Sequence, residues 1–241
     1  MRALILFSLL FFNNAAIAAP GISLDLGNGP QGVSSSIQIL ILLTILSVAP
    51  SILLMTTSFV RFVIVFSMLR TAMGIGSLPP TQVLIALSLI LTFVVMQPTF
   101  TQINDEAIQP FIAQKIDEKV FIEKLTRPLT TFMLKQTGDK ELSLAFKLAE
   151  INKPGSIQET PFHITIFAFI LSELKKAFQI GFMIFLPFIV IDMIVASALV
   201  SVGLMFLPPT TLSLPFKIVL FILIDGWNIL SEGLVLSFKT G

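Results

Sequence analysis

Apolar residues of this chain gather in long runs at both ends of the sequence, with a more polar stretch between them. The first runs cover residues 37–60, 62–69 and 83–96, and the last third of the chain is apolar again. Residues 99–160 are polar, with apolar positions at helical spacing. We therefore predict an all-α fold of apolar helical hairpins and a small polar helical segment.

The lengths of the apolar runs bear on how the chain meets a membrane. A helix that crosses a bilayer needs about 20 apolar residues. Residues 83–96, which end at Gln97–Pro98, would extend only about 21 Å as a helix. Charged residues also bound the run at 177–191, and only residues 37–60 are comfortably long enough. The pattern thus favours helices packed against helices of other chains, in a helical multi-subunit assembly associated with a membrane.

Several charged residues interrupt these apolar runs. Each would cost about 2.5–3.5 kcal/mol if it faced lipid at the centre of a helix that spans the membrane. They must therefore face protein, water or each other. Glu173 and Lys176 lie three positions apart, which fits either a pair on one helix or a contact between subunits. The buried polar or inter-subunit residues that we predict are Arg61, Glu173, Lys176, Asp192, Lys217 and Asp225.

The motif G-x-x-x-L-P-P occurs twice between apolar runs. Glycine frees the backbone, and proline lacks an N–H group and restricts the residue before it. Each copy therefore predicts a break between two apolar helices. The break residues are Gly74, Pro79 and Pro80 in the first copy, and Gly203, Pro208 and Pro209 in the second.

The N-terminus has the features of a secretory signal. Arg2 precedes an apolar stretch, and Ala16-Ile17-Ala18 is a small-x-small cleavage site. We expect a signal peptide at 1–18, a flexible leader at 19–36, a first hairpin at 37–98, the polar segment at 99–160 and a second hairpin at 161–241.

The polar segment is expected to hold several helices. Apolar positions at helical spacing run from residue 108 to 120, and Arg127–Pro128 is predicted to end that helix and begin the next. A further helical pattern spans residues 142–149. Eight Lys/Arg against nine Asp/Glu give this segment no positive excess, which is compatible with the outer, periplasmic side of the membrane.

Composition narrows the possible chemistry. Only 12% of residues are charged, about half of what a soluble domain carries, and the net charge of +1 offers no footprint for nucleic acid. The chain has no Cys and a single histidine, His163, and it contains neither a phosphate-binding loop nor an H-E-x-x-H motif. We therefore predict no catalytic, metal-binding or cofactor-binding residue, and no enzymatic activity.

With the blocks LSVAPSILLMTTSF at 46–59, LSELK at 171–175 and DGW at 225–227, the chain resembles the FliP family of flagellar type III secretion export-gate proteins. The resemblance rests on a dozen short blocks in the family's order, between about residue 43 and residue 230. They also include PPTQVLI at 79–85, AFQIGF at 177–182 and LPFK at 214–217.

The resemblance implies more than the composition does. Members of this family form a pentamer that joins two smaller partners, FliQ and FliR, in a closed helical complex at the bacterial inner membrane. The complex belongs to the flagellar basal body, has a periplasm-facing part and passes unfolded flagellar subunits out of the cell. No cofactor resides in the protein.

The resemblance also implies a role for the second break. In the family, a methionine-rich loop just before the proline pair projects into the pore and forms a gasket. The matching positions are Leu204, Met205 and Phe206, of which only Met205 keeps the methionine. Leu and Phe can still close a ring by packing, although Phe is stiffer than Met.

Other functions remain open on the residues alone. The injectisome branch of the same family exports virulence effectors, but the signal peptide favours the flagellar branch. An ion- or proton-coupled transporter would use Asp192 and Asp225 in the apolar phase. An intramembrane enzyme ranks last because no catalytic set is recognisable.

Overall fold

The structure is a computed structural model that describes residues 30–152, 154, 156, 160–204 and 206–239. The predicted signal peptide, most of the predicted leader and Met205 lie outside the described residues. All regular elements among the described residues are helices, which confirms the all-α prediction. By internal contacts the chain divides into two units, residues 1–49 and 50–241.

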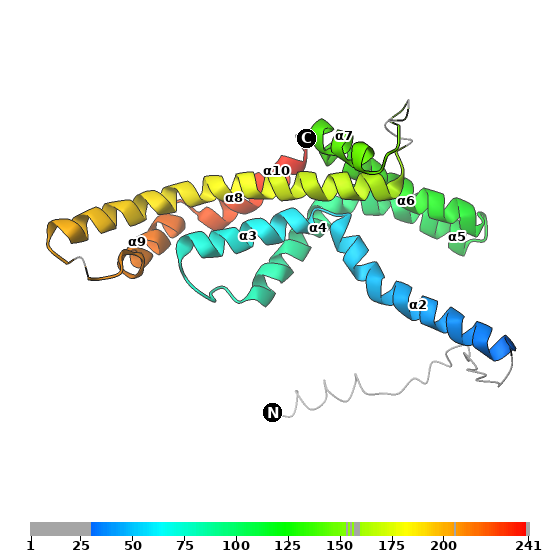
Figure 1. The fold of residues 1–241 in the computed structure, drawn as a ribbon, viewed down its shortest axis with the longest axis horizontal. Coiled ribbons are helices and arrows are strands. Elements are labelled where there is room, and N and C mark those ends of the chain that lie inside the picture. The colour runs from blue at the N-terminus through cyan, green and yellow to red at the C-terminus, as the bar shows by residue number, and fades with distance from the viewer. Residues whose placement is uncertain (1–29, 153, 155, 157–159, 205, 240–241) are drawn as a thin grey trace. The chain divides into compact units, whose positions relative to one another are not determined.

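Figure 1 shows the order of the helices along the chain. In chain order they are α2 (Pro30–Met55), α3 (Phe59–Met73), α4 (Thr81–Ile103), the π-helix η1 (Asn104–Ile108), α5 (Gln109–Ile112), α6 (Glu118–Gln136), α7 (Asp139–Leu148), α8 (Phe162–Ser201), α9 (Pro209–Leu223) and α10 (Gly226–Lys239). Because α2 begins at Pro30, the last part of the predicted leader is helical.

The longest helix, α8, forms the centre of the second unit. It packs along α3 and also contacts α6, α7 and α9 (Figure 1, where α8 runs from yellow-green to orange). The main core cluster joins Phe62, Val65 and Phe66 of α3 to Ala177 of α8. Gly181 allows the two helices to approach closely, since a Cβ atom there would lie 2.2 Å from the sulfur of Met68.

The helix predicted over residues 108–120 is interrupted, since α5 ends at Ile112 and α6 begins at Glu118. Two predicted helix ends are also wrong, and both involve proline. The helix that was expected to stop at Gln97–Pro98 continues to Ile103, and Pro128 lies inside α6. A proline within a helix removes one backbone hydrogen bond, but packing can compensate for that loss. Met96 and Ile103, on either side of Pro98, pack with Leu129 of α6 in one cluster.

The charges of the last third do not break the helix either. The helix α8 has 40 residues and runs without interruption past Glu173, Lys176 and Asp192. The apolar runs counted in the sequence are therefore parts of one helix. Each charge bounds a run of apolar residues without ending the helix, because the two acidic side chains have cationic partners on other helices.

More of the chain is long and apolar enough to cross a membrane than the lengths of the apolar runs predicted. Two stretches, Thr81–Ile112 and Phe162–Ser201, are long and apolar enough to cross a membrane. The helices Pro209–Leu223 and Gly226–Phe238, bent by 63° at their junction, form a possible broken span. Only 6% of the most apolar window in Phe162–Ser201 is buried within the chain. Lipid or other chains must therefore cover this part of α8.

Candidate functional site

The helix α8 carries a buried ion pair near its beginning. Arg61 of α3 binds both carboxylate oxygens of Glu173, and its Nε atom donates to Oε2 at 2.8 Å. The other ends of the guanidinium donate to Oγ of Ser237 at 2.7 Å and to Oε1 of Gln136 at 3.3 Å. We call these residues, together with Phe238, the arginine cluster.

The ion pair of the arginine cluster is closed to solvent. The side chains of Arg61 and Glu173 are 1% and 0% exposed. The ring of Phe238 lies under the guanidinium, 3.5 Å from Cζ to the ring centroid, in a cation–π contact. Gln136 donates in turn to the carbonyl oxygen of Phe238 at 3.0 Å. Four helices, α3, α6, α8 and α10, therefore meet at one satisfied ionic group.

A second ion pair lies near the end of α8. Nζ of Lys217, on α9, donates to Oδ2 of Asp192 at 2.7 Å and to the carbonyl oxygen of Ala72 at 3.1 Å. Ser213 donates to the other carboxylate oxygen of Asp192. We call Ala72, Asp192, Ser213 and Lys217 the lysine cluster. It joins α8 and α9 to the last turn of α3.

The two arms that the lysine cluster joins are connected by the second G-x-x-x-L-P-P motif. Gly203 has a φ of +77°, a left-handed conformation that favours glycine. Pro209 is the first residue of α9, where a missing N–H group costs nothing. Within the connection Leu204 is 37% exposed and Phe206 79% exposed. At the tip of this hairpin the described chain thus leaves the apolar side chain of Phe206 largely uncovered.

The first motif separates helices in the same way. Helix α3 ends at Met73, Gly74 follows with a φ of +72°, and its N–H group donates to the carbonyl oxygen of Thr71. Pro80 immediately precedes α4.

The remaining two predicted polar residues differ in their surroundings. Asp225 is exposed at the junction of α9 and α10, has a φ of +53°, and accepts a hydrogen bond of 2.7 Å from Asn228. Lys176 is half-buried, and its Nζ atom donates to the carbonyl oxygen of Gln136 at 2.9 Å. No ion pair between Lys176 and Glu173 occurs among the described residues, because Glu173 faces Arg61.

Sequence reasoning missed the uncharged members of both clusters. Gln136 ends a polar helix, and Ser213 and Ser237 lie in apolar helices where a hydroxyl group commonly bonds its own backbone. The positions of these residues in the sequence do not indicate which charged side chain they bond. The one available signal was that a charge in an apolar helix needs several hydrogen-bond partners.

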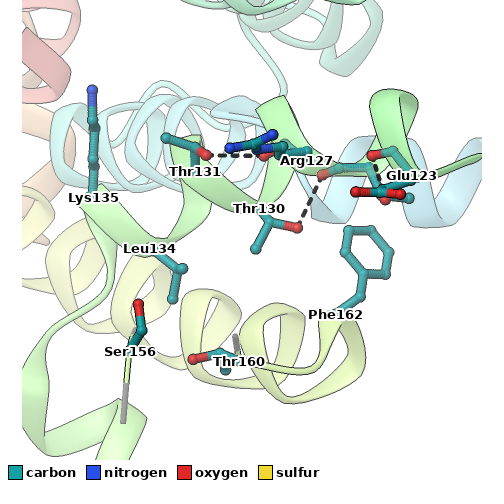
Figure 2. A pocket seen from close by; sticks show the side chains of 10 residues that line it. Glu123, Arg127, Thr130, Thr131, Leu134, Lys135, Ser156, Thr160 and Phe162 are labelled. Carbon is teal, nitrogen blue, oxygen red and sulfur yellow. Dashed lines mark hydrogen bonds between the residues drawn. The ribbon is translucent and has the colours of Figure 1, made fainter. Parts of the chain in front are cut away.

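The polar segment contains a hollow of about 730 Å³ beside the first turn of α8. Figure 2 shows Thr130 and Leu134 of α6 on one side and Phe162 of α8 on the other. Half of the residues that line it carry a hydroxyl group. The full lining is Glu123, Thr126, Arg127, Thr130, Thr131, Leu134, Lys135, Ser156, Thr160 and Phe162. Among the described residues, no three His, Asp or Glu side chains come together as metal ligands.

Comparison with known proteins decides the family. A family model described as "FliP family" matches residues 42–234. The chain belongs to the FliP family. Its match covers α3 through most of α10, so both ion pairs and both G-x-x-x-L-P-P motifs lie inside it. The resemblance noted in the sequence is thereby confirmed.

Individual FliP relatives are similar in sequence to this chain over most of their length. The protein named "Flagellar biosynthetic protein FliP" of Bacillus subtilis strain 168 is 50% identical over 209 residues, which cover 87% of this chain and 95% of the relative. The protein of the same name from Aquifex aeolicus is 46% identical over 222 residues (91% and 92%). That of Caulobacter vibrioides is 45% identical over 227 residues (94% and 85%).

Proposed function

We propose that this chain is a pore-forming core component of the flagellar type III protein export gate. In this role it passes unfolded flagellar subunits across the bacterial inner membrane. Membership of the FliP family supports the flagellar role, and the exposed apolar tip of the α8–α9 hairpin supports the pore. The exposed Phe206 is the observation on which the pore proposal rests.

The tip closes the pore by packing against its equivalents from other copies. A ring of apolar side chains excludes water and ions by dewetting, and it needs no charge or cofactor to do so. Leu204, Met205 and Phe206 form this gasket, with Met205 outside the described residues. Because Phe is stiffer than Met, the ring opens by movement of the whole tip more than by bending of its side chains.

The exposed apolar surface of α8 supports the proposed assembly. Within one chain only 6% of the most apolar window of this helix is buried. We propose that a pentamer of the chain, with FliQ-like and FliR-like subunits, buries that surface at the inner membrane. The polar segment at 99–160 then faces the periplasm, as its lack of a positive excess suggests.

Replacing Phe206 by Ala tests the gasket. We expect the complex to assemble, and cells that produce it to leak small solutes or ions more than those with the parent complex. Phe216→Ala is the matched control because Phe216 is 62% exposed on α9, away from the tip. Equal permeability of the Phe206→Ala and parent complexes would overturn the gasket role.

The flagellar role is separable from that of the injectisome branch. The relatives named above are all called flagellar biosynthetic proteins, which favours the flagellar branch. Deletion of the gene from its source bacterium should abolish flagella and the release of hook and filament subunits. Normal flagella combined with lost secretion of virulence effectors would assign the chain to the injectisome.

A further inference from the structure

Lys176 is a cation whose charge is not balanced within the described chain. It lies half-buried in the apolar helix α8, and its one hydrogen bond goes to a backbone carbonyl group. The nearby carboxylate of Glu173 already pairs with Arg61. Glu141, the other nearby carboxylate, pairs with Lys175. Three cations and two carboxylates at this place therefore leave a surplus positive charge beside an apolar surface.

A hollow of about 410 Å³ opens beside Lys176. Its walls are apolar, from Ile180, Phe182 and Met183, and its polar side is formed by Arg61, Lys176, Gln179 and Ser237. A cation partly removed from water, with no counter-ion, is costly, and a carboxylate relieves that cost. The chemistry therefore suits a carboxylate carried on an apolar helix.

Such a carboxylate exists on the chain itself. Glu232 is exposed on the apolar helix α10, and Ile229 and Leu236 on the same helix are 59% and 45% exposed. No hydrogen bond or ion pair among the described residues involves Glu232. Two unbalanced opposite charges thus lie on one chain, each among apolar side chains.

Lys176 and Glu232 belong to different faces of the molecule. Ser237 of α10 lines the hollow, and Glu232 is five positions earlier, which turns it by about 140° around the helix. A contact between unlike faces is head-to-tail, and repeated head-to-tail contacts close into a ring when the rotation permits.

We propose that the Glu232 carboxylate of a second copy of this chain enters the hollow and pairs with Lys176. The hollow is then an interface between neighbouring copies, and the ion pair fixes their register. This inference rests on the proposed self-association and adds the residues that would join one copy to the next.

Charge exchange between two tagged versions tests the pairing. One version carries Lys176→Glu and the other Glu232→Lys. Each version alone places like charges in every contact, whereas every contact between unlike versions restores opposite charges. We expect each version alone to self-associate about tenfold less than the parent chain. When both are produced together, one tag should recover the other. The proposal would be overturned if each version alone associated as well as the two versions produced together.

A milder pair of variants covers the case in which charge reversal prevents folding. Lys176→Gln should reduce the oligomer fraction, whereas Lys175→Gln should not, because Lys175 is exposed and pairs with Glu141 within its own chain. An equal response to the two glutamine substitutions would also contradict the pairing.

Cysteine cross-linking locates the contact directly. The chain has no cysteine of its own, and a side chain at Gly233 would meet no atom within 4 Å. Oxidation of the Gln179→Cys/Gly233→Cys protein should give a ladder of linked copies, whereas each single variant should stop at a dimer or below. An intact oligomer without a ladder would refute this contact alone. A monomeric parent chain would refute the proposed self-association as well.

Discussion

The arginine cluster and the lysine cluster hold ion pairs on the same helix, but in different surroundings. Both charges of the first pair are sealed, at 1% and 0% exposure, whereas Lys217 is 4% and Asp192 29% exposed. The sealed pair joins helices of the packed body. The half-open pair joins the two arms of the hairpin that ends in the exposed tip. Water can therefore replace a partner for Asp192, but not for Arg61, Glu173 or Lys217.

This difference sets what each charge costs when its partner is removed. A charge left alone in a dry site is destabilising by several kcal/mol, whereas one that reaches water is not. In the arginine cluster the loss of either partner should therefore be severe. In the lysine cluster the cost should depend on which partner remains.

The largest effect is expected in the arginine cluster. Arg61→Leu should lower the free energy of unfolding by about 3–5 kcal/mol, because Glu173 is left buried and unpaired. Thermal unfolding can be followed by the fluorescence of Trp227, the only tryptophan, whose ring contacts Phe221 at 5.3 Å between centroids.

The double variant Arg61→Leu/Glu173→Leu is the control for that experiment. It removes both charges, so most of the lost stability should return. A double variant less stable than Arg61→Leu alone would show that the cluster stabilises by its hydrogen bonds, and not only by compensating its own burial.

Asymmetry is expected in the lysine cluster. Asp192→Asn leaves the buried Lys217 without a counter-ion and should cost about 2–3 kcal/mol. Lys217→Met leaves a partly exposed Asp192 and should cost about 1 kcal/mol. The same unfolding assay measures both. If Lys217→Met proves the more damaging change, the bond from Lys217 to the end of α3 matters more than the ion pair.

The smallest effect is expected at a third, exposed pair. Nζ of Lys175 donates to Oε1 of Glu141 at 2.7 Å, and this hydrogen bond lowers the pKa of Glu141. Because the pKa of this carboxyl group is lower in the folded chain than in the unfolded chain, the pair stabilises the fold at a pH above the pKa of the unfolded chain. This stabilisation is lost as the pH falls through the pKa of the folded chain. At neutral pH, Lys175→Gln should change the unfolding free energy by less than about 0.5 kcal/mol. A loss as large as that for Asp192→Asn would contradict the dependence on burial.

The contrast between the clusters also shows what the sequence could predict. The need for partners was visible from Arg61, Glu173, Asp192 and Lys217, since lipid cannot solvate them. The identity of the partners was not, because Arg61 and Glu173 lie 112 positions apart. Because such partners are far away in the sequence, each charge of α8 could only be read as an interruption of an apolar run.

Some helix ends could be predicted from the sequence and others could not. The glycine–proline breaks were predictable because their cause is local to the backbone. Pro98 and Pro128 lie inside helices because Met96, Ile103 and Leu129 pack around them, and only the tertiary structure brings those residues together. Exposure of the tip could not be derived from spacing, since Phe206 would be equally apolar in a core.

Electron microscopy of the purified complex, produced together with the proposed FliQ-like and FliR-like subunits, tests the proposed pore most directly. We expect a ring of five copies in which residues 203–208 of every copy converge on the central axis, with Phe206 at the constriction. A ring whose α8–α9 tips face lipid, or a complex with a single copy of this chain, would contradict the proposed pore.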